Sequence, residues 1–193
     1  YVQNFAPTDH GFDHIAWGDM AALDTAITDN TAGIIVETVQ GEGGIRPLTA
    51  EMLSHIRQVC DAQGLLLILD EVQCGIGRSG KLFAYETFGI EPDILASAKG
   101  LGGGFPIGAC LVSEKVGQHM VLGTHGSTFG GNPLAAAVGN AVLDLVFEPG
   151  LLENVQKQAE TLRVGLEELV SECPAVLSKV SGLGLMIGAR CEI

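Results

Sequence analysis

Short continuous apolar runs alternate along the chain with segments whose apolar positions recur at helical spacing. Continuous apolar runs of this length are typical of buried strands, and they lie at 33–37, 65–69, 94–98 and 107–112. Helical spacing at 49–64 and 151–169 predicts two amphipathic helices, and a shorter helix is predicted at 21–28. A helix between two strands forms a βαβ unit, whose strands are parallel. The pattern therefore predicts an α/β protein with a mostly parallel sheet covered by helices on both faces.

Polar residues that cap helices mark where the predicted helices begin. A side-chain oxygen at such a position accepts a hydrogen bond from a free N–H group of the first helical turn. Residues of this kind precede three of the helical stretches: Asp19, Thr49 and Asn132. The helix after Thr49 is expected to end near Gly64. The helix at 134–146 is Ala-rich and apolar on most faces, so we expect it to be buried.

The tripeptide Glu148-Pro149-Gly150 interrupts the helical pattern and is the expected domain boundary. We predict a large domain over 1–147 and the beginning of a smaller α+β domain over 148–193. The long amphipathic helix after the break is expected to pack its apolar stripe into a core, and a strand is predicted at 182–189.

Composition narrows the classes of partner. The chain has 193 residues, of which 47% are hydrophobic, so it can bury a sizeable core. Its net charge of −13 argues against nucleic acid or an anionic membrane surface as a partner, although a small anion can still bind at a local site. No signal peptide and no apolar run of membrane-spanning length is present in the sequence, so no membrane partner is expected.

The five cysteines are scattered, without a C-x-x-C pair, and their number is odd. We therefore expect neither a disulfide framework nor a metal site. Unpaired cysteines fit a reducing compartment, so the predicted location is the cytoplasm.

Three side chains with useful chemistry stand at the ends of predicted strands: Glu37, Asp70 and Lys99. The carboxyl ends of parallel strands meet at one sheet edge, where α/β proteins bind their ligands. Lys99 directly follows an apolar run and precedes four glycines, so we expect it to lose hydration. Desolvation favours the neutral amine that an imine-forming lysine needs. A solvated lysine that opens a glycine turn is the alternative.

A cofactor with an aldehyde on a pyridine ring would use these residues. Lys99 could carry it as an imine, and Asp70 could keep the ring nitrogen protonated, which makes the ring an electron sink. Gln73 could hydrogen-bond to a ring oxygen, while Val72 packs on the ring face. Backbone N–H groups and hydroxyls at 127–131 could hold a phosphate.

A second glycine-rich stretch, Gly75–Gly80, matches the G-x-G-x-x-G pattern of dinucleotide-binding loops. Residues 70–74 separate it from the preceding strand, and the acids that follow are too close in sequence, so this site is not favoured. Leu82 also replaces the hydroxyl that binds magnesium in a P-loop. Neither nucleotide site is predicted.

Four longer segments resemble the class III (fold type I) pyridoxal-phosphate-dependent aminotransferases, nearest to the members that act on N2-acetylornithine. They are VETVQGEGGIRP (36–47), LILDEVQCGIGRSGKLFAYE (67–86), PDILASAKGLGGGFPIGA (92–109) and THGSTFGGNPLA (124–135). The resemblance covers nearly the whole chain. It implies that 1–147 is the second half of a large domain that binds pyridoxal 5'-phosphate, and that 148–193 begins the small C-terminal domain.

The resemblance implies roles for the residues around the cofactor. Lys99 would form the internal imine and would be the base that moves a proton between substrate and cofactor. Asp70 would pair with the pyridine nitrogen. Glu71, Val72 and Gln73 would belong to the cofactor-binding set, with Gln73 at the ring oxygen.

The resemblance also implies a second group of residues around the substrate and the dimer interface. Glu37 would support the region of Asp70, and Glu42 would tune which end of the substrate is accepted. Ser127 would lie near the substrate. Thr128 would reach the cofactor phosphate of a neighbouring subunit, which implies a homodimer with a shared active site.

The activity that the resemblance implies is amino transfer from N2-acetylornithine to 2-oxoglutarate, in arginine biosynthesis. Ornithine, succinylornithine, succinyldiaminopimelate and 4-aminobutyrate stay open as alternative donors. A mutase or decarboxylase that uses the same lysine is a second enzymatic alternative.

Parts of the family's site are expected to lie outside the sequence. The phosphate loop and the aromatic residue that stacks on the ring should precede Tyr1, and the arginine that holds the substrate carboxylate should follow Ile193. The chain begins with Tyr and stops within a strand-like run, so we expect a fragment. A non-catalytic fragment that retains the fold and the dimer surface is therefore the non-enzymatic alternative.

Overall fold

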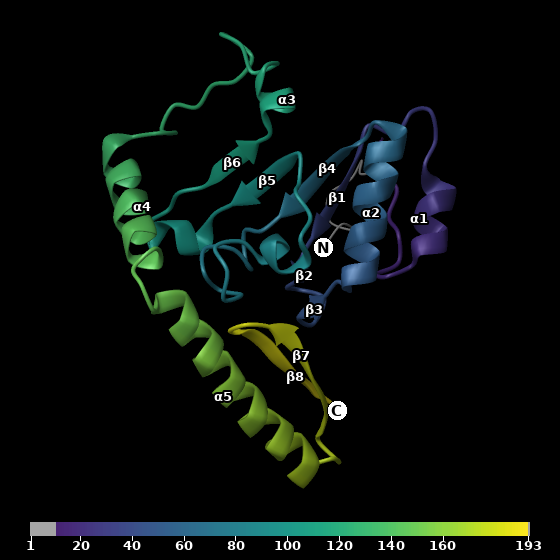
Figure 1. The fold of residues 1–193 in the computed structure, drawn as a ribbon, viewed down its shortest axis with the longest axis vertical. Helices are drawn as coiled ribbons and strands as arrows, with labels where there is room; N and C mark the ends of the chain where they lie inside the picture. Colours follow the sequence, from purple (N-terminus) through teal and green to yellow (C-terminus); the bar gives the residue numbers. More distant parts are fainter. Residues whose placement is uncertain (1–10, 193) are drawn as a thin grey trace.

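The computed structural model describes residues 11–192 and shows a four-stranded sheet with helices beside it, from which a long helix and a hairpin extend (Figure 1). The strand order is β1-β4-β5-β6, and the strands are Gly33–Glu37 (β1), Leu66–Asp70 (β4), Ile94–Ser97 (β5) and Ala109–Val112 (β6). β1, β4 and β5 are parallel, whereas β6 runs antiparallel to β5. The predicted α/β class with a mostly parallel sheet is confirmed.

Two capped helices precede and follow β1. α1 (Met20–Ala26) begins at Asp19, whose carboxylate accepts a backbone hydrogen bond of 2.9 Å from the first turn. α2 (Ala50–Gln63) begins at Thr49, whose hydroxyl accepts a similar bond of 3.1 Å, and it ends at Gly64 with a φ of 71°. Glycine adopts this left-handed conformation without strain. Both predicted caps and the predicted end of α2 are confirmed.

The main core lies between α2 and one face of the sheet. Its fully buried members include Leu53, Ile56, Cys60, Leu67 and Leu69. Neighbouring residues of a strand point to opposite faces. Ile34 and Val36 of β1 therefore pack against this core, while Ile35 between them is 59% exposed on the other face.

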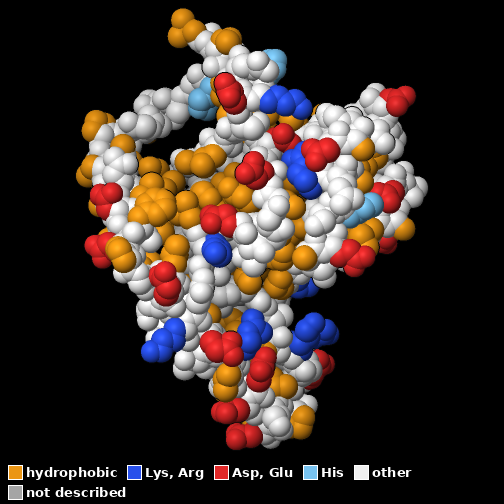
Figure 2. Space-filling view, viewed as in Figure 1, with side chains coloured by type: hydrophobic (Ala, Val, Ile, Leu, Met, Phe, Trp, Pro, Cys, Tyr) orange, Lys and Arg blue, Asp and Glu red, His pale blue; other side chains and the backbone are white. Residues whose placement is uncertain are grey.

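Much of that second face is open. The four residues of β6 are exposed, and Figure 2 shows apolar side chains gathered between α4 and the sheet. α4 (Pro133–Val146) begins at Asn132 as predicted, but the expectation that it is buried is wrong. Leu134 and Leu145 are each more than half exposed. The helix packs through the side that includes Ala135 and Gly139, and in the described residues nothing covers the rest.

Asp93 fastens the start of β5 to α2 and β4. Its carboxylate accepts hydrogen bonds from the backbone N–H of Leu67 at 2.8 Å and from the Arg57 guanidinium at 2.9 Å. Burial by itself would raise the pKa of Asp93, but the hydrogen bonds from Leu67 and Arg57, together with the Arg57 charge, lower it below its ordinary value of 3.8. The ionised carboxylate therefore stabilises the folded state.

We expect Asp93→Asn to lower the free energy of unfolding at neutral pH by about 2 kcal/mol, since hydrogen bonds to charged groups contribute on this scale. Because the pKa is lowered on folding, this contribution is complete above pH 3.8 and is lost as the pH falls through the folded-state value. Urea titrations at several pH values measure the difference between variant and parent. Asp61→Asn removes the exposed partner of the same arginine and is the matched control. A difference that persists undiminished in acid would contradict this account.

The C-terminal part consists of one helix and one hairpin. α5 (Leu151–Glu172) is packed against β7 (Leu177–Leu183) and β8 (Met186–Cys191), which are antiparallel. The Arg163 guanidinium donates a 2.9 Å hydrogen bond to the carbonyl of Gly182 and so ties the two together. The single strand predicted at 182–189 is wrong, because the chain turns at Gly184, which has a φ of 57°. The apolar stripe of α5 is only partly covered, since Ala159 is the one buried residue among those described in this helix.

The break between α4 and α5 falls at the predicted tripeptide. The division into domains at 147/148 stays a prediction. Within residues 11–192, no single helix is long and apolar enough to cross a membrane. α4 and α5 meet that criterion only when taken together, by length and composition, and they are bent by 72° at the break.

Candidate active site

Two of the three strand-end residues are direct neighbours. Glu37 ends β1 and Asp70 ends β4, and the two are register partners across the parallel ladder. Asp70 is also paired in register with Ala96 of β5, three residues before Lys99. The predicted meeting of the strand ends at one edge is therefore confirmed for the backbone. Asp70 is partly buried, and its carboxylate accepts a 3.0 Å hydrogen bond from the N–H of Val72.

Lys99 differs from the expectation in its surroundings. β5 ends at Ser97, and Lys99 opens a short 3₁₀ helix, Lys99–Gly102 (η3), after Ala98. The residue is exposed, so the predicted loss of hydration is wrong for the chain as described. The reason is that the strand stops before the lysine and the backbone turns. The φ of Lys99 is 42°, a left-handed value that is uncommon outside glycine.

The hairpin after β1 contributes the loop GEGG to the same edge. The hairpin pairs β2 (Val39–Gln40) with β3 (Arg46–Pro47). The Glu37 carboxylate accepts a 2.9 Å hydrogen bond from the N–H of Gly41. The side-chain amide of Gln73 lies against Gly41 so closely that a Cβ there would overlap it. Glu37 and Gln73 thus hold the loop that carries the exposed Glu42.

Glu71 has a different position from the one expected. Its side chain is fully buried, and its carboxylate accepts hydrogen bonds from the Thr38 hydroxyl at 2.9 Å, the Ala84 N–H at 2.6 Å and the Tyr85 N–H at 2.8 Å. Burial raises the pKa of Glu71 more than these hydrogen bonds and one from Cys74 lower it. The prediction placed Glu71 in the cofactor-binding set. For its carboxylate we correct this prediction, because the described partners of the carboxylate are all groups of the chain itself. It anchors η2 (Ala84–Phe88) to the strand end.

Cys74 is buried beside Glu71, and burial together with the Glu71 charge raises the pKa of its thiol well above the ordinary range. Such a thiol is not a nucleophile at neutral pH. Cys74 therefore packs in the core.

Ser127 and Thr128 lie away from the strand ends. They belong to the connection between α3 (Glu114–Gly117) and α4, residues 118–132, which we call the arm; it projects from the body of the chain (Figure 1). Ser127 accepts a 2.9 Å hydrogen bond from the Gly130 N–H within the arm. Leu122 and Phe129 are 104% and 82% exposed. The structure therefore does not bring Thr128 to the Asp70 edge of its own chain.

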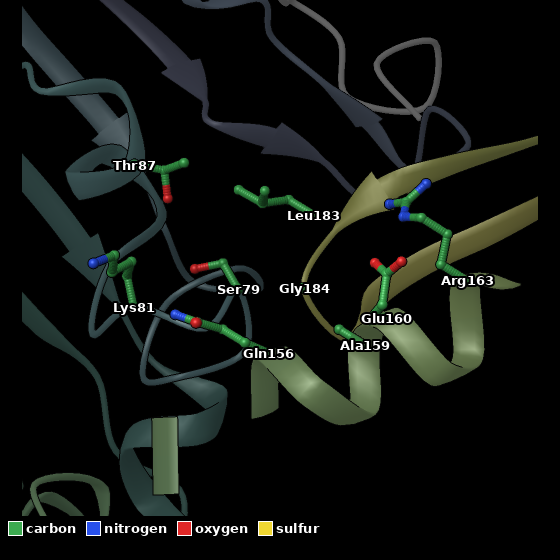
Figure 3. A pocket seen from close by; sticks show the side chains of 9 residues that line it. All are labelled: Ser79, Lys81, Thr87, Gln156, Ala159, Glu160, Arg163, Leu183 and Gly184. Carbon is green, nitrogen blue, oxygen red and sulfur yellow. The ribbon is translucent and has the colours of Figure 1, made fainter. Parts of the chain in front are cut away.

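The strand-end residues line neither of two hollows in the described part of the chain. One, of about 310 Å³, lies between the Gly75–Gly80 segment, α5 and the β7–β8 turn (Figure 3). The other, of about 670 Å³, lies between α1 and α2. The candidate site is instead an open edge. No cluster of three metal-ligating side chains occurs in the described range.

Sequence reasoning missed two strained positions beside this edge. Ile45 follows the GEGG loop with a φ of 53°, and Ile76 lies within Gly75–Gly80 with a φ of 52°. The carbonyl of Ile45 accepts a 2.7 Å hydrogen bond from the Ser181 hydroxyl of β7. The sequence gives no signal for these two residues, because a left-handed φ is typical of glycine and asparagine and is rarely adopted by β-branched residues such as isoleucine.

Comparisons with known proteins agree on one family. The family model described as aminotransferase class III matches residues 5–192. An acetylornithine aminotransferase of Mesorhizobium japonicum is 55% identical over 193 residues, which is 100% of this chain and 48% of that protein. One from Brucella suis is 54% identical over the same span. The chain thus spans about half the length of the curated relatives that it matches.

Solved structures show the same fold. The ornithine aminotransferase from Toxoplasma gondii superimposes with a TM-score of 0.91 at 36% identity, over 98% of this chain and 45% of that one. The N-acetylornithine aminotransferase from Stenotrophomonas maltophilia superimposes with a TM-score of 0.82 at 38% identity, over 95% of this chain and 49% of that one.

Proposed function

The chain belongs to the class III aminotransferases, and from this we propose that its protein transfers the amino group of N2-acetylornithine to 2-oxoglutarate with pyridoxal 5'-phosphate as cofactor. The observation that carries the proposal is the register pairing of Asp70 with Ala96, three residues before Lys99, in a chain 55% identical to an acetylornithine aminotransferase. The expectation of a fragment agrees with the length of the relatives.

The residues at this edge fit the proposed cofactor in their chemistry. An exposed amine at Lys99, a partly buried carboxylate at Asp70 and an amide at Gln73 come from adjacent segments. When bound, pyridoxal phosphate supplies a protonated ring that stabilises negative charge developing at the substrate α-carbon. Asp70 would hold the proton on the ring nitrogen, and Lys99 would attach the cofactor and move the proton at the α-carbon.

The neighbouring residues would orient the two ligands. Val72 and Gln73 would contact the ring and its oxygen. Glu37 would act indirectly, because it holds the N–H of Gly41 at the base of the GEGG loop. Glu42 on that loop would select which end of the amino donor enters.

The arm supports a homodimer as part of the proposal. Thr128 is exposed on an extension that also exposes Leu122 and Phe129, and large exposed apolar groups of this kind are typical of surfaces that become covered. A second copy would cover the arm and would receive Thr128 at its cofactor phosphate, with Ser127 near the substrate. The five described cysteines are unpaired, which supports the proposed location in the cytoplasm. The proposed amino donor would place the protein in arginine biosynthesis.

The amino donor is the part of the proposal that a direct assay tests. We expect the full-length protein to use N2-acetylornithine with a kcat/KM at least about 10-fold higher than ornithine, succinylornithine, succinyldiaminopimelate or 4-aminobutyrate, because a methylene-sized or polar mismatch in a pocket changes kcat/KM by such factors. Glutamate formation from 2-oxoglutarate measures each rate. If the protein prefers ornithine, then ornithine takes the place of N2-acetylornithine as the proposed amino donor, as in the name of the T. gondii enzyme. If the donor is converted to a product without formation of glutamate, the reaction is that of a mutase or a decarboxylase.

A further inference from the structure

A strained isoleucine packs against the residue that follows Lys99. Ile76 has a φ of 52° and Lys99 a φ of 42°. A left-handed conformation in a non-glycine residue costs about 1–3 kcal/mol and persists only where the surroundings hold it. For a β-branched residue it is a genuine outlier. Two such residues lie in segments that touch each other, so contacts around them must hold both backbones in this conformation.

The contact between these segments runs through Gly100. A Cβ added at Gly100 would lie 3.2 Å from the Cβ of Ile76 and 3.6 Å from its Cγ2. Ile76 therefore packs closely on Gly100, and a larger residue there would push it by a few tenths of an ångström. On its other side, Gly100 is joined by one peptide bond to the strained backbone of Lys99, so a shift of either segment moves the lysine.

The loop that carries Ile76, Gly75–Gly80, is itself held on several sides. The Gly75 N–H donates to the carbonyl of Glu71 at 3.0 Å, and the Gly77 N–H donates to that of Leu82 at 3.2 Å. The Glu71 carboxylate is in turn anchored in the core.

Two further contacts come from the C-terminal part of the chain. The Leu185 N–H of the β7–β8 turn donates to the carbonyl of Arg78 at 2.9 Å, and the Gln156 amide of α5 donates to that of Gly80 at 2.9 Å. Gly184 lies against the backbone of Ser79, so closely that a Cβ there would overlap it (Figure 3). Because both ends of the loop are tied, Ile76 keeps its strained conformation.

We propose that Ile76 is a positioning residue for Lys99: its side chain, clamped by the loop Gly75–Gly80, supports Gly100 and so fixes the direction in which the Lys99 side chain leaves the backbone. The proposal rests on the proposed function of Lys99 for its catalytic consequence. Proton transfer depends on close placement, and a displacement of about 1 Å at a reacting group can cost about 100-fold in rate.

The test uses the full-length protein and a pair of substitutions that oppose each other. Gly100→Ala inserts a methyl group against Ile76, and Ile76→Gly in the same chain removes the two carbons that it would meet. We expect Gly100→Ala to lower kcat about 5-fold, because a shift of a few tenths of an ångström is a fraction of the displacement of about 1 Å that costs about 100-fold. The double variant should recover most of that loss, because the added methyl group then occupies the space of the removed carbons and supports the backbone in their place. Gly165→Ala is the matched control, because a Cβ there meets no atom within 4 Å.

Two readouts separate positioning from general damage. The first is the rate at which acetic anhydride acetylates Lys99 in cofactor-free protein, measured by peptide mass mapping against Lys157. The second is the pH midpoint of the visible band after addition of pyridoxal phosphate. We expect both to change in Gly100→Ala and to return toward the parent value in the double variant. Unfolding by urea establishes that each variant is folded.

The outcomes decide between the proposals. Unchanged acetylation of Lys99 in folded Gly100→Ala, or a change that Ile76→Gly does not reverse, overturns the positioning role. If the parent protein forms no visible band on Lys99, the proposed function fails, yet the acetylation rates still measure the coupling of Ile76 to Lys99. If the band forms and the acetylation rates show no coupling, only the positioning role fails.

Discussion

Replacement of Lys99 by alanine in the full-length protein is expected to lower kcat by about 1000-fold or more, because a positioned proton-transfer group alone contributes about 100- to 10,000-fold. Lys99 stands at the edge that Asp70 shares, and its amine is exposed and thus reachable by a cofactor aldehyde. The variant loses the covalent attachment point and the base together. Glutamate formation from N2-acetylornithine and 2-oxoglutarate measures the rate, and absorbance after addition of pyridoxal phosphate measures attachment.

Lys157→Ala is the control for this experiment, since Lys157 is an exposed residue of α5 far along the chain from the edge. We expect it to retain the parent rate and the visible band. Borohydride reduction followed by peptide mapping should place the label of the parent protein on Lys99 alone. Label spread over surface lysines, or a Lys99→Ala variant with full activity, would falsify the assignment of this residue.

Replacement of Glu71 by alanine is expected to lower the free energy of unfolding by about 4 kcal/mol, because each buried donor left without an acceptor costs about 1–3 kcal/mol. Three donors lose their acceptor at once: the Thr38 hydroxyl and the N–H groups of Ala84 and Tyr85. Urea unfolding followed by circular dichroism measures the change. Where the alanine variant does not fold at all, Glu71→Gln provides the measurement, since an amide oxygen keeps part of the acceptor set.

The pH dependence gives Glu71→Gln a second, independent result. Burial, the largest cause, raises the folded-state pKa of Glu71 above its ordinary value of 4.5. The contribution of this carboxyl group is therefore complete below pH 4.5 and is lost as the pH rises through the folded-state pKa. The parent should exceed Glu71→Gln most in acid, and the gap should narrow on the way to neutral pH. A gap that widens instead would mean that the carboxylate gains more from its hydrogen bonds than burial costs it. Exposed Glu168→Gln serves as the control.

Local chemistry accounts for the elements that the sequence predicts well. Thr49, Gly64 and Asn132 act within one turn of their own helix, so their side chains and conformations suffice to place its limits. The meeting of Glu37 with Asp70 follows from topology, because parallel strands joined through a helix bring their carboxyl ends to one edge.

Long-range contacts decide the features that the sequence did not reveal. The acceptor role of Glu71 depends on Thr38, 33 residues earlier, and on N–H groups 13 and 14 residues later. The exposure of Lys99 depends on where β5 stops, which an apolar run ending in alanine does not disclose. Residues 182–189 read as one strand because glycine is compatible with strands and turns alike, and only the pairing of β7 with β8 reveals the turn.

The succession Asp70-Glu71 also protects the sheet against misfolding. Glu37 and Asp70 form one register pair at the edge, and Thr38 and Glu71 are joined immediately after it in the interior. A slip of β4 by one residue would turn Asp70 into the core and Glu71 toward solvent, which leaves one buried charge without partners and three donors without an acceptor. Misregistered chains are thus destabilised at the candidate site, so that a chain which folds stably presents the Asp70 carboxylate at the sheet edge.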